Sequence, residues 1–174
     1  MAVPVEAFLA DVYLAGTFDG TPAALREELD AGSTVDLGDV TLVALADLAE
    51  GNAEHAPVGS VAAGEMLLAA LPSDSDAPHL HRVYYAVELF LGPYTVVGEL
   101  AVLPGFDPGR ALTRPASDFV ELRSAQVRIA TPSGQIEHEY EQISVNRFAV
   151  ERVGCEVDVT FWFPGAAQEL PPEE

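Results

Sequence analysis

The chain has 174 residues, 49% of them apolar, which is enough for one domain with a substantial core or for two very small domains. Its 28 acidic residues face eight arginines and no lysine, giving a formal net charge of −20 that repels phosphate backbones and anionic membranes. Nucleic acid and membrane surfaces are therefore disfavoured as partners, and basic proteins or cations are favoured.

The acidic charge is concentrated in the first part of the chain. Residues 1–79 hold 14 acidic residues and one arginine, whereas residues 80–174 hold 14 acidic residues and seven arginines. The amino-terminal stretch MAVPVEAFLADVY lacks a basic region followed by a long apolar run, and no segment reaches about 18 uncharged apolar residues. We expect a cytoplasmic protein without a signal peptide or membrane span.

The first predicted element is a short helix in GTPAALREELDAG. Thr21 can cap this helix, Pro22 suits its first turn, and Gly32 can end it. Leu25 and Leu29 share one face, which predicts that the helix packs on a core.

A strand is predicted next, in VDLGDVTLVALADL. Strict alternation places Val35, Leu37 and Asp39 on one side of it and Val40 and Leu42 on the other.

A second short helix is predicted in GSVAAGEMLLAALP. Ser60 can cap it, Met66, Leu67 and Leu71 supply its apolar residues, and Pro72 stops it. Gly64 weakens this helix, since glycine is a poor helix former.

The polar, proline-containing stretch PSDSDAP, residues 72–78, is the best linker in the chain. It predicts an N-terminal β subdomain with short helices over residues 1–71 and a C-terminal, barrel-like β domain over residues 79–174. The two halves share a pattern, since DVYLAGTFDG followed by VDLGDVTLVAL parallels ELFLGPYTVVG followed by VELRSAQVRIA. An internal duplication is one interpretation of this pattern.

Strands dominate the second half. RVYYAVELFL and YTVVGELAVL are rich in β-branched and aromatic residues, and Gly92-Pro93 separates them, which predicts a hairpin. The stretch DFVELRSAQVRIA alternates and then changes phase near Ser124, as a β-bulge would cause. QIEHEYEQISV, RFAVERV and CEVDVTFWF complete the set.

We therefore expect a mostly β protein with six to eight strands in a small barrel or sandwich, built as two similar β subdomains or one duplicated barrel, with two short helices.

The lone Cys155 excludes an intramolecular disulfide. It alternates with Val157, Val159, Phe161 and Phe163, so a strand is predicted on which the thiol packs as a small hydrophobic group.

Residues 82–153 resemble a family of small, uncharacterised bacterial β domains of unknown function. The resemblance rests on the aromatic opening strand at 84–90, the G-x-L-x-x-L-P-G turn at 98–105, the strand at 119–127 and the I-x-V-N-R stretch at 143–147. It implies a small Sm-like barrel and carries no activity. Sm-like barrels suggest RNA binding, which the acidic charge of this chain opposes.

A metal site is one alternative for function. His79 and His81, at i and i+2 of a strand, would point to one face and could offer two imidazoles to a divalent transition metal. The stretch resembles the first motif of cupins, metal-binding β barrels, which implies a metal-dependent enzyme acting on a small molecule. Glu88 lies farther along the chain than the cupin glutamate, and His138 is the one later histidine, so the second cupin motif is missing.

Other enzyme chemistry has little support in the sequence. There is no G-x-S-x-G nucleophile motif, no P-loop and no dinucleotide-binding G-x-G-x-x-G. The absence of lysine excludes Schiff-base chemistry on a lysine side chain. We therefore lean against an enzyme and expect no cofactor.

The carboxyl-terminal stretch TFWFPGAAQELPPEE predicts a protein interface. Phe161 and Phe163 would point to one side of a strand and Trp162 to the other, so at least one large aromatic could anchor a partner or a second copy. The alternative is that Trp162 packs beneath the first half of the chain. Our leading hypothesis is a non-catalytic protein-binding or scaffolding module.

Overall fold

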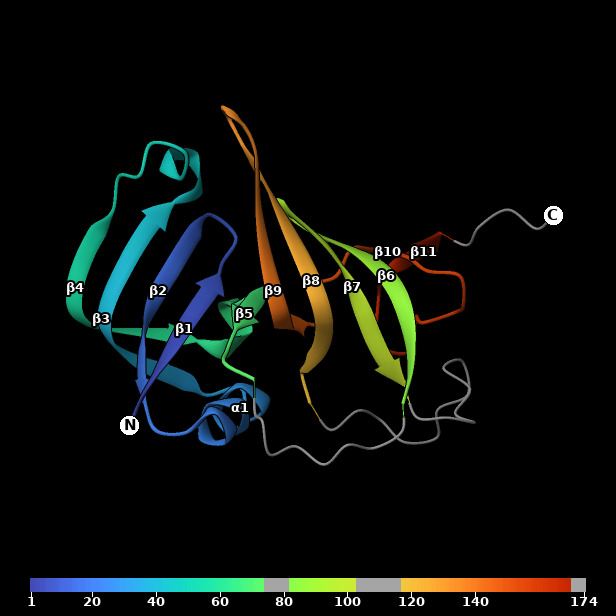
Figure 1. Ribbon diagram of the computed structural model, residues 1–174, viewed down its shortest axis with the longest axis horizontal. Coiled ribbons are helices and arrows are strands. Elements are labelled where there is room, and N and C mark those ends of the chain that lie inside the picture. Colours follow the sequence, from blue (N-terminus) through green and yellow to red (C-terminus); the bar gives the residue numbers. More distant parts are fainter. Residues whose placement is uncertain (74–81, 103–116, 170–174) are drawn as a thin grey trace.

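A computed structural model of the chain describes residues 1–73, 82–102 and 117–169. Within these ranges eleven strands form one hydrogen-bonded sheet with the order β11-β10-β6-β7-β8-β9-β5-β1-β2-β3-β4 (Figure 1). Their bounds are β1 Ala2–Phe8, β2 Val12–Asp19, β3 Thr34–Ala44, β4 Glu54–Ala62, β5 Leu68–Ala70, β6 Val83–Leu91, β7 Tyr94–Val102, β8 Phe119–Thr131, β9 Gly134–Asn146, β10 Arg152–Gly154 and β11 Ala167–Glu169. The α-helix α1, Pro22–Asp30, and two 3₁₀ turns, η1 Leu45–Asp47 and η2 Ala63–Glu65, complete the described elements.

The mostly β prediction is confirmed, but the sheet is open and does not close into a barrel. A barrel needs every strand to turn the same face to one interior. The central strands break this condition, because Ala7 and Ala69 point into one hydrophobic cluster while their neighbours Phe8 and Leu68 point into another. The two cores therefore lie on opposite faces of one sheet.

Helix α1 forms as predicted. The hydroxyl of Thr21 accepts a hydrogen bond from Ala24 N at 3.1 Å, and Pro22 stands in the first turn. Leu25 and Leu29 are both buried in the core of the first half. Gly32 follows the helix with φ of 68°, a left-handed conformation that glycine adopts readily.

The second predicted helix is wrong. Its segment forms the end of β4, the turn η2 and the three-residue strand β5. Leu68 is fully buried and pairs with Phe8 on one side and Val145 on the other, so hydrogen bonding to two neighbours overrides the helix propensity of this leucine-alanine run.

The predicted hairpin and bulge are confirmed. Strands β6 and β7 pair antiparallel around the turn at Gly92. In β8 the register against β7 shifts between Val97 and Glu99, and Ser124 has φ of 49°. The bulge changes which residues face the core, from Leu122 before it to Ala125 after it.

Strand β3 holds a second bulge that strict alternation did not predict. Asp39 has φ of 49°, and the register against β2 shifts between Ala15 and Thr17. Leu37 and Val40 consequently face the same core, although strict alternation separates them. In both halves one glycine, Gly16 or Gly98, therefore opposes the two residues at the bulge.

The halves also match in their last strands. The amide of Leu67 donates to Phe8 O at 2.8 Å, and the amide of Glu151 donates to Phe90 O at 2.9 Å. These bonds start the antiparallel pairs β1–β5 and β6–β10. The duplication itself stays a prediction.

A three-residue strand joins the halves. Strand β5 pairs with β1 of its own half and with β9 of the other, and Asn146 N donates to Leu67 O at 2.9 Å. The predicted linker, residues 72–78, lies mostly outside the described residues.

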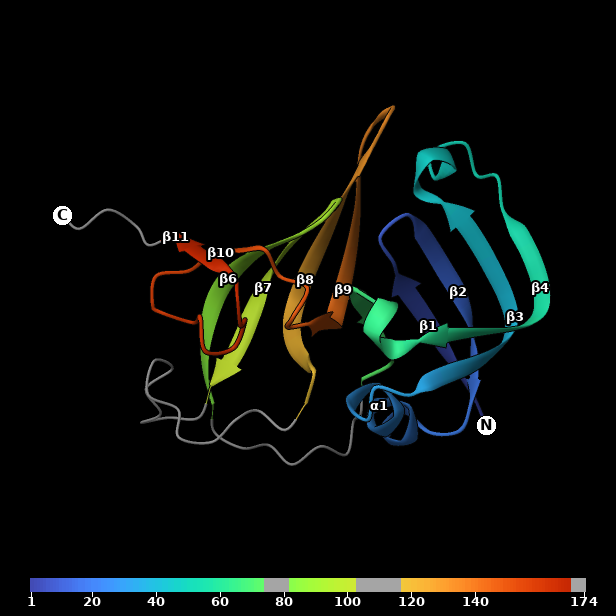
Figure 2. The same cartoon turned by 180° about the vertical axis from the view of Figure 1, so that it is seen from behind.

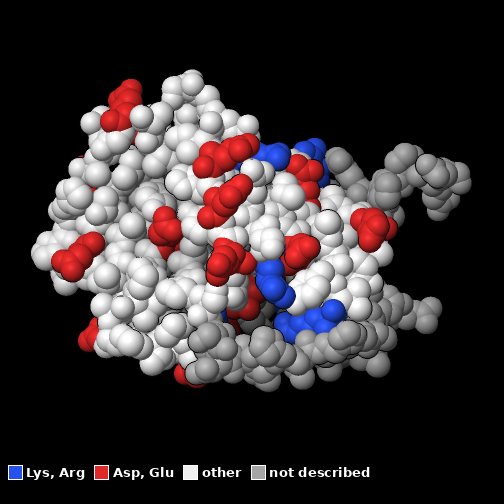
Figure 3. Space-filling view, viewed as in Figure 1, with Lys and Arg blue, Asp and Glu red and all other residues white. Residues whose placement is uncertain are grey.

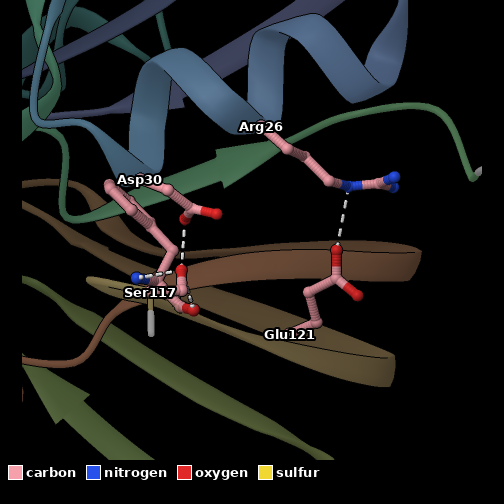
Figure 4. Close-up of polar contacts among 5 residues, drawn as sticks. Arg26, Asp30, Ser117 and Glu121 are labelled. Carbon is pink, nitrogen blue, oxygen red and sulfur yellow. Dashed lines mark hydrogen bonds and ion pairs between the residues drawn. The ribbon is translucent and has the colours of Figure 1, made fainter. Parts of the chain in front are cut away.

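Polar contacts add to this junction on one side (Figure 4). Arg26 Nε on α1 lies 3.0 Å from Glu121 Oε1 on β8, and the Ser117 hydroxyl donates to Asp30. Partly exposed ion pairs of this kind contribute at most about 1 kcal/mol. Backbone pairing and apolar packing therefore supply most of the stability of the contact between the halves.

The predicted strand over residues 155–163 is wrong, because this segment forms turns. The carboxylate of Asp158 accepts hydrogen bonds from both the amide and the hydroxyl of Thr160, which bends the chain locally. Val159 and Phe163 are buried on the core side of the second half, where Figure 2 shows the segment in front of β6 and β7.

We predict that Gly98→Ala destabilises the protein. A Cβ at this position would lie 3.2 Å from both the Arg123 carbonyl oxygen and the Leu122 Cβ, beside the bulge. We expect a loss of about 1–3 kcal/mol in the free energy of unfolding, measured by urea denaturation. Gly64→Ala is the control, because a Cβ there meets nothing within 4 Å. Equal stability of the two variants would contradict the close-packed bulge.

Candidate protein-interaction site

The residues of the predicted metal site are only partly described. His79 and His81 lie outside the described residues. Glu88 on β6 alternates with the buried Val87 and Leu89, so its side chain lies on the face opposite the core.

The structure does not bring Glu88 and His138 together. His138 on β9 pairs with the buried Val127 and stacks on Tyr140 at a centroid distance of 6.3 Å, so it lies on the core side. Strands β6 and β9 are three positions apart in the sheet, which corresponds to about 14 Å. Across the described ranges no three His, Cys, Asp or Glu side chains gather as a metal site would require.

The aromatic residues of the predicted interface differ in burial. Phe163 is fully buried and belongs to the core, while Phe161 and Trp162 are half-buried. Arg147, itself buried, donates to the carbonyl oxygens of Trp162 and Phe161 at 3.0 and 3.2 Å. These bonds hold the aromatic run against the second half.

One buried and two half-buried tyrosines fill the contact between the halves. Phe8 packs against Tyr13, Tyr94 and Tyr140 at centroid distances of 5.2, 5.5 and 6.1 Å. The Tyr13 hydroxyl donates to the Glu6 carboxylate, and the Tyr94 hydroxyl donates to Leu9 O at 2.5 Å. We call Glu6, Phe8, Tyr13, Tyr94 and Tyr140 the junction cluster.

Burial raises the pKa of all three tyrosines in the junction cluster above its usual value near 10. The charge of Glu6 raises the pKa of Tyr13 and Tyr140 further. Glu6 lies close enough to act on Tyr140 electrostatically, but the buried Tyr140 hydroxyl makes no hydrogen bond of normal geometry. The cluster therefore serves packing between the halves.

An exposed surface of the second half carries arginine–aromatic pairs. The Arg123 guanidinium lies 4.9 Å from the centre of the Tyr84 ring and also donates to its hydroxyl. The Arg152 guanidinium lies 4.0 Å from the centre of the Phe90 ring. Tyr84 and Phe90 share one face of β6, six residues or about 20 Å apart. We call Tyr84, Phe90, Arg123 and Arg152 the arginine–aromatic face.

No described helix or strand covers this face of β6 and β7, which Figure 1 views directly. In Figure 3, from the same side, arginine atoms lie beside uncharged surface and between acidic groups. On this face Tyr84 is about two-fifths exposed, at 40%.

Phe90, at one end of the arginine–aromatic face, corresponds to Phe8 in the contact surface of the first half. Phe8 pairs with Tyr13 and Leu68, and these three residues pack against the second half. Phe90 occupies the matching position on β6, where it pairs with Thr95 and Arg152. The surface around Phe8 is thus apolar and buried, while the surface around Phe90 is more polar and only partly buried.

Comparison with protein-family models, with curated proteins and with solved structures finds no match. The resemblance of residues 82–153 to small bacterial β domains stays a prediction. No described helix is long and apolar enough to cross a membrane.

Sequence reasoning missed the arginine–aromatic face, although a signal was present. Tyr84, Glu88 and Phe90 stand at alternate positions of β6, while the core residues Leu89 and Leu91 occupy the other register. Large apolar side chains on both registers of one strand indicate that the strand has apolar surface on the face opposite the core as well. The pairing arginines come from β8 and β10, so only the strand order could identify them.

We predict opposite effects for two tyrosine substitutions in the junction cluster. Tyr13→Phe removes a hydrogen bond to a carboxylate and should cost about 1.5–3 kcal/mol. Tyr140→Phe removes a buried hydroxyl without a partner and should be neutral or stabilise by up to about 1 kcal/mol. Urea unfolding at neutral pH measures both, and equal losses would contradict the hydrogen-bond assignment.

Stability should also fall above about pH 10, the usual tyrosine pKa. The folded state raises the pKa of Tyr13, Tyr94 and Tyr140, so their contribution is complete below that pH and is lost above it, as the unfolded chain releases the protons. Each phenol contributes a slope of about 1.4 kcal/mol per pH unit. Urea midpoints across this range should decline less steeply for Tyr140→Phe, and an unchanged slope would contradict the raised pKa.

Proposed function

We propose that the protein is a cytoplasmic, non-catalytic binding module that holds a protein partner on the arginine–aromatic face. The observation that carries the proposal is the correspondence between Phe90 and Phe8. The surface around Phe8 buries itself against the second half, whereas around its half-buried counterpart Phe90 the Arg152 side chain is exposed. A surface whose equivalent forms an intramolecular contact is suited to form an intermolecular one.

The chemistry of the face supports this proposal. Tyrosine and arginine are enriched in protein interfaces and supply a large share of their energetic anchors. An arginine stacked on an aromatic ring loses less side-chain freedom on binding than an unrestrained arginine, because the ring already limits its conformations. Arg123 and Arg152 are held in this way on a strongly acidic protein, which directs a partner with acidic and apolar groups to this face.

The alternative is the metal-dependent enzyme predicted from His79, His81, Glu88 and His138. The distance between Glu88 and His138 along the sheet does not favour one site that contains both. Elemental analysis of purified protein tests this alternative directly. Stoichiometric zinc, iron, nickel or manganese that is lost in a His79→Ala/His81→Ala double variant would support the enzyme and oppose the binding module.

We predict that a photo-crosslinking residue at Ala86, which is exposed on β6 between the two aromatic side chains, captures one protein partner in extracts of the source cells. Arg123→Glu and Arg152→Glu should each reduce the yield at least tenfold, equivalent to about 1.4 kcal/mol of affinity. Gel electrophoresis and mass spectrometry measure the product.

The control places the crosslinker at Ser133, in the exposed turn between β8 and β9. Thermal unfolding confirms that the charge-reversed variants remain folded. A product that is equally abundant from Ser133, or unaffected by either charge reversal, would contradict a partner on the arginine–aromatic face.

A further inference from the structure

Strand β4 is the edge of the sheet in the first half. It pairs with β3 alone, and no described strand lies along its other side. Val58 in its middle is 73% exposed. The backbone of this edge is thus accessible for further pairing.

The register shows which backbone groups of β4 point outward. The amide of Ala63 donates to Ser33 O at 3.0 Å, so this pair lies at a hydrogen-bonded position of the β3–β4 ladder. Hydrogen-bonded and non-hydrogen-bonded pairs alternate along antiparallel strands. The odd-numbered residues of β4 therefore bond to β3, and Ala56, Val58 and Ser60 turn their amide and carbonyl groups outward.

Proline does not block this edge. Pro57 is an odd-numbered residue, so its missing amide hydrogen lies on the β3 side, opposite the bulge at Asp39. Natural sheets often protect an edge with an outward-facing proline or a lysine. Here the outward amides are intact, and the chain contains no lysine.

The second half has a strand at the corresponding edge. Strand β9 is paired to the bulged strand β8 in the same way that β4 is paired to the bulged strand β3. The pair Asp36–Ser60 in the β3–β4 ladder therefore corresponds to the pair Glu121–Ser144 in the β8–β9 ladder. The outer edge of β9 is filled by β5, with Ala69 opposite Ser144 and Leu68 opposite Val145. A strand on β4 in the same register would place an apolar residue opposite Val61.

Charge selects the occupant. Asp36, Asp39 and Glu54 are exposed on β3 and β4, and residues 1–79 contain one arginine, Arg26, which pairs with Glu121. A second copy of β4 would bring like charges together, whereas lysine and arginine flanking a short apolar core would meet opposite charge.

We propose that the β4 edge binds an extended, basic segment of a protein partner by antiparallel strand addition, in the register in which β9 binds β5. The main chain supplies the hydrogen bonds, and apolar residues opposite Val61 extend the core of the first half. This surface is separate from the arginine–aromatic face, so the two can be tested independently.

The probe is a fluorescent peptide with the β5 core Met-Leu-Leu-Ala-Ala between paired lysines, titrated with the full chain and followed by anisotropy. A peptide with the same core between paired glutamates is the charge control. We expect the lysine peptide to bind at least tenfold more tightly at low salt, to weaken as salt is added, and to shift amide resonances of β4.

Ser60→Pro and Ser60→Ala form the matched pair of variants. Both remove the hydrogen bond from the Ser60 hydroxyl to Asp36, but only proline removes the outward amide. We expect proline to weaken the lysine peptide at least tenfold relative to alanine. If Ser60→Pro does not fold, Val58→Pro against Val58→Ala makes the same comparison at the next outward amide.

Three results would overturn the proposal: no binding of the lysine peptide, equal binding by the proline and alanine variants, or equal affinity for the two peptides. A concentration-dependent dimer in sedimentation that Ser60→Pro abolishes would also overturn it, and would assign the edge to a second copy of the chain. Loss of crosslinking at Ala86 with peptide binding intact would affect only the arginine–aromatic face.

Discussion

The arrangement of the molecule depends on one three-residue strand, β5, in which Leu68 and Ala69 pair with neighbouring strands on both sides. Strand β5 takes β1 as one neighbour and β9 as the other, and Leu68, Ala69 and Ala70 are all buried. Full burial of Leu68 contributes about 1.5–3 kcal/mol. On the other face of β5, the small side chain of Ala69 packs into the core of the first half. A polar or bulky residue here would separate the halves, because no other described strand bridges them.

Pairing through β5 explains why the sheet stays open and why the arginine–aromatic face and the β4 edge remain accessible to partners. Strand β5 runs antiparallel to both β1 and β9. As a result, the strands of the second half run opposite to the corresponding strands of the first half. The second half therefore buries the opposite face of the sheet. Phe8 can therefore reach the core of the second half, while its half-buried counterpart Phe90 lies on the opposite face beneath Arg152. The same offset leaves β4 without the neighbour that β9 has. In this open sheet, β4 therefore remains an edge strand at the end of the first half.

The sequence predicts what local chemistry decides. Thr21, Pro22 and Gly32 define α1, and the phase change at Ser124 defines a bulge, because each signal lies within the element itself. The bulge at Asp39 was not predicted, because Val35 and Val43 on either side of it fit one uninterrupted apolar alternation. Strand β5 and the turns after Cys155 depend on distant partners, namely Phe8, Val145 and Arg147, that no local pattern identifies. The arginine–aromatic face needs the order of β6, β8 and β10, so its arginines could not be predicted as a group.

The acidic charge of the first half opposes pairing between two copies of the exposed β4 edge. Strand β4 would pair readily with a copy of itself if this edge were neutral, since its outward amides are free of proline and Val58 is exposed. The net charge of −20 opposes that contact, because two first halves would bring their acidic side chains together. Acidic residues therefore discourage edge-to-edge pairing here, as lysine and proline do in many other sheets. Unlike proline, they leave the hydrogen-bonding groups accessible, so repulsion excludes identical chains while a basic segment can still pair.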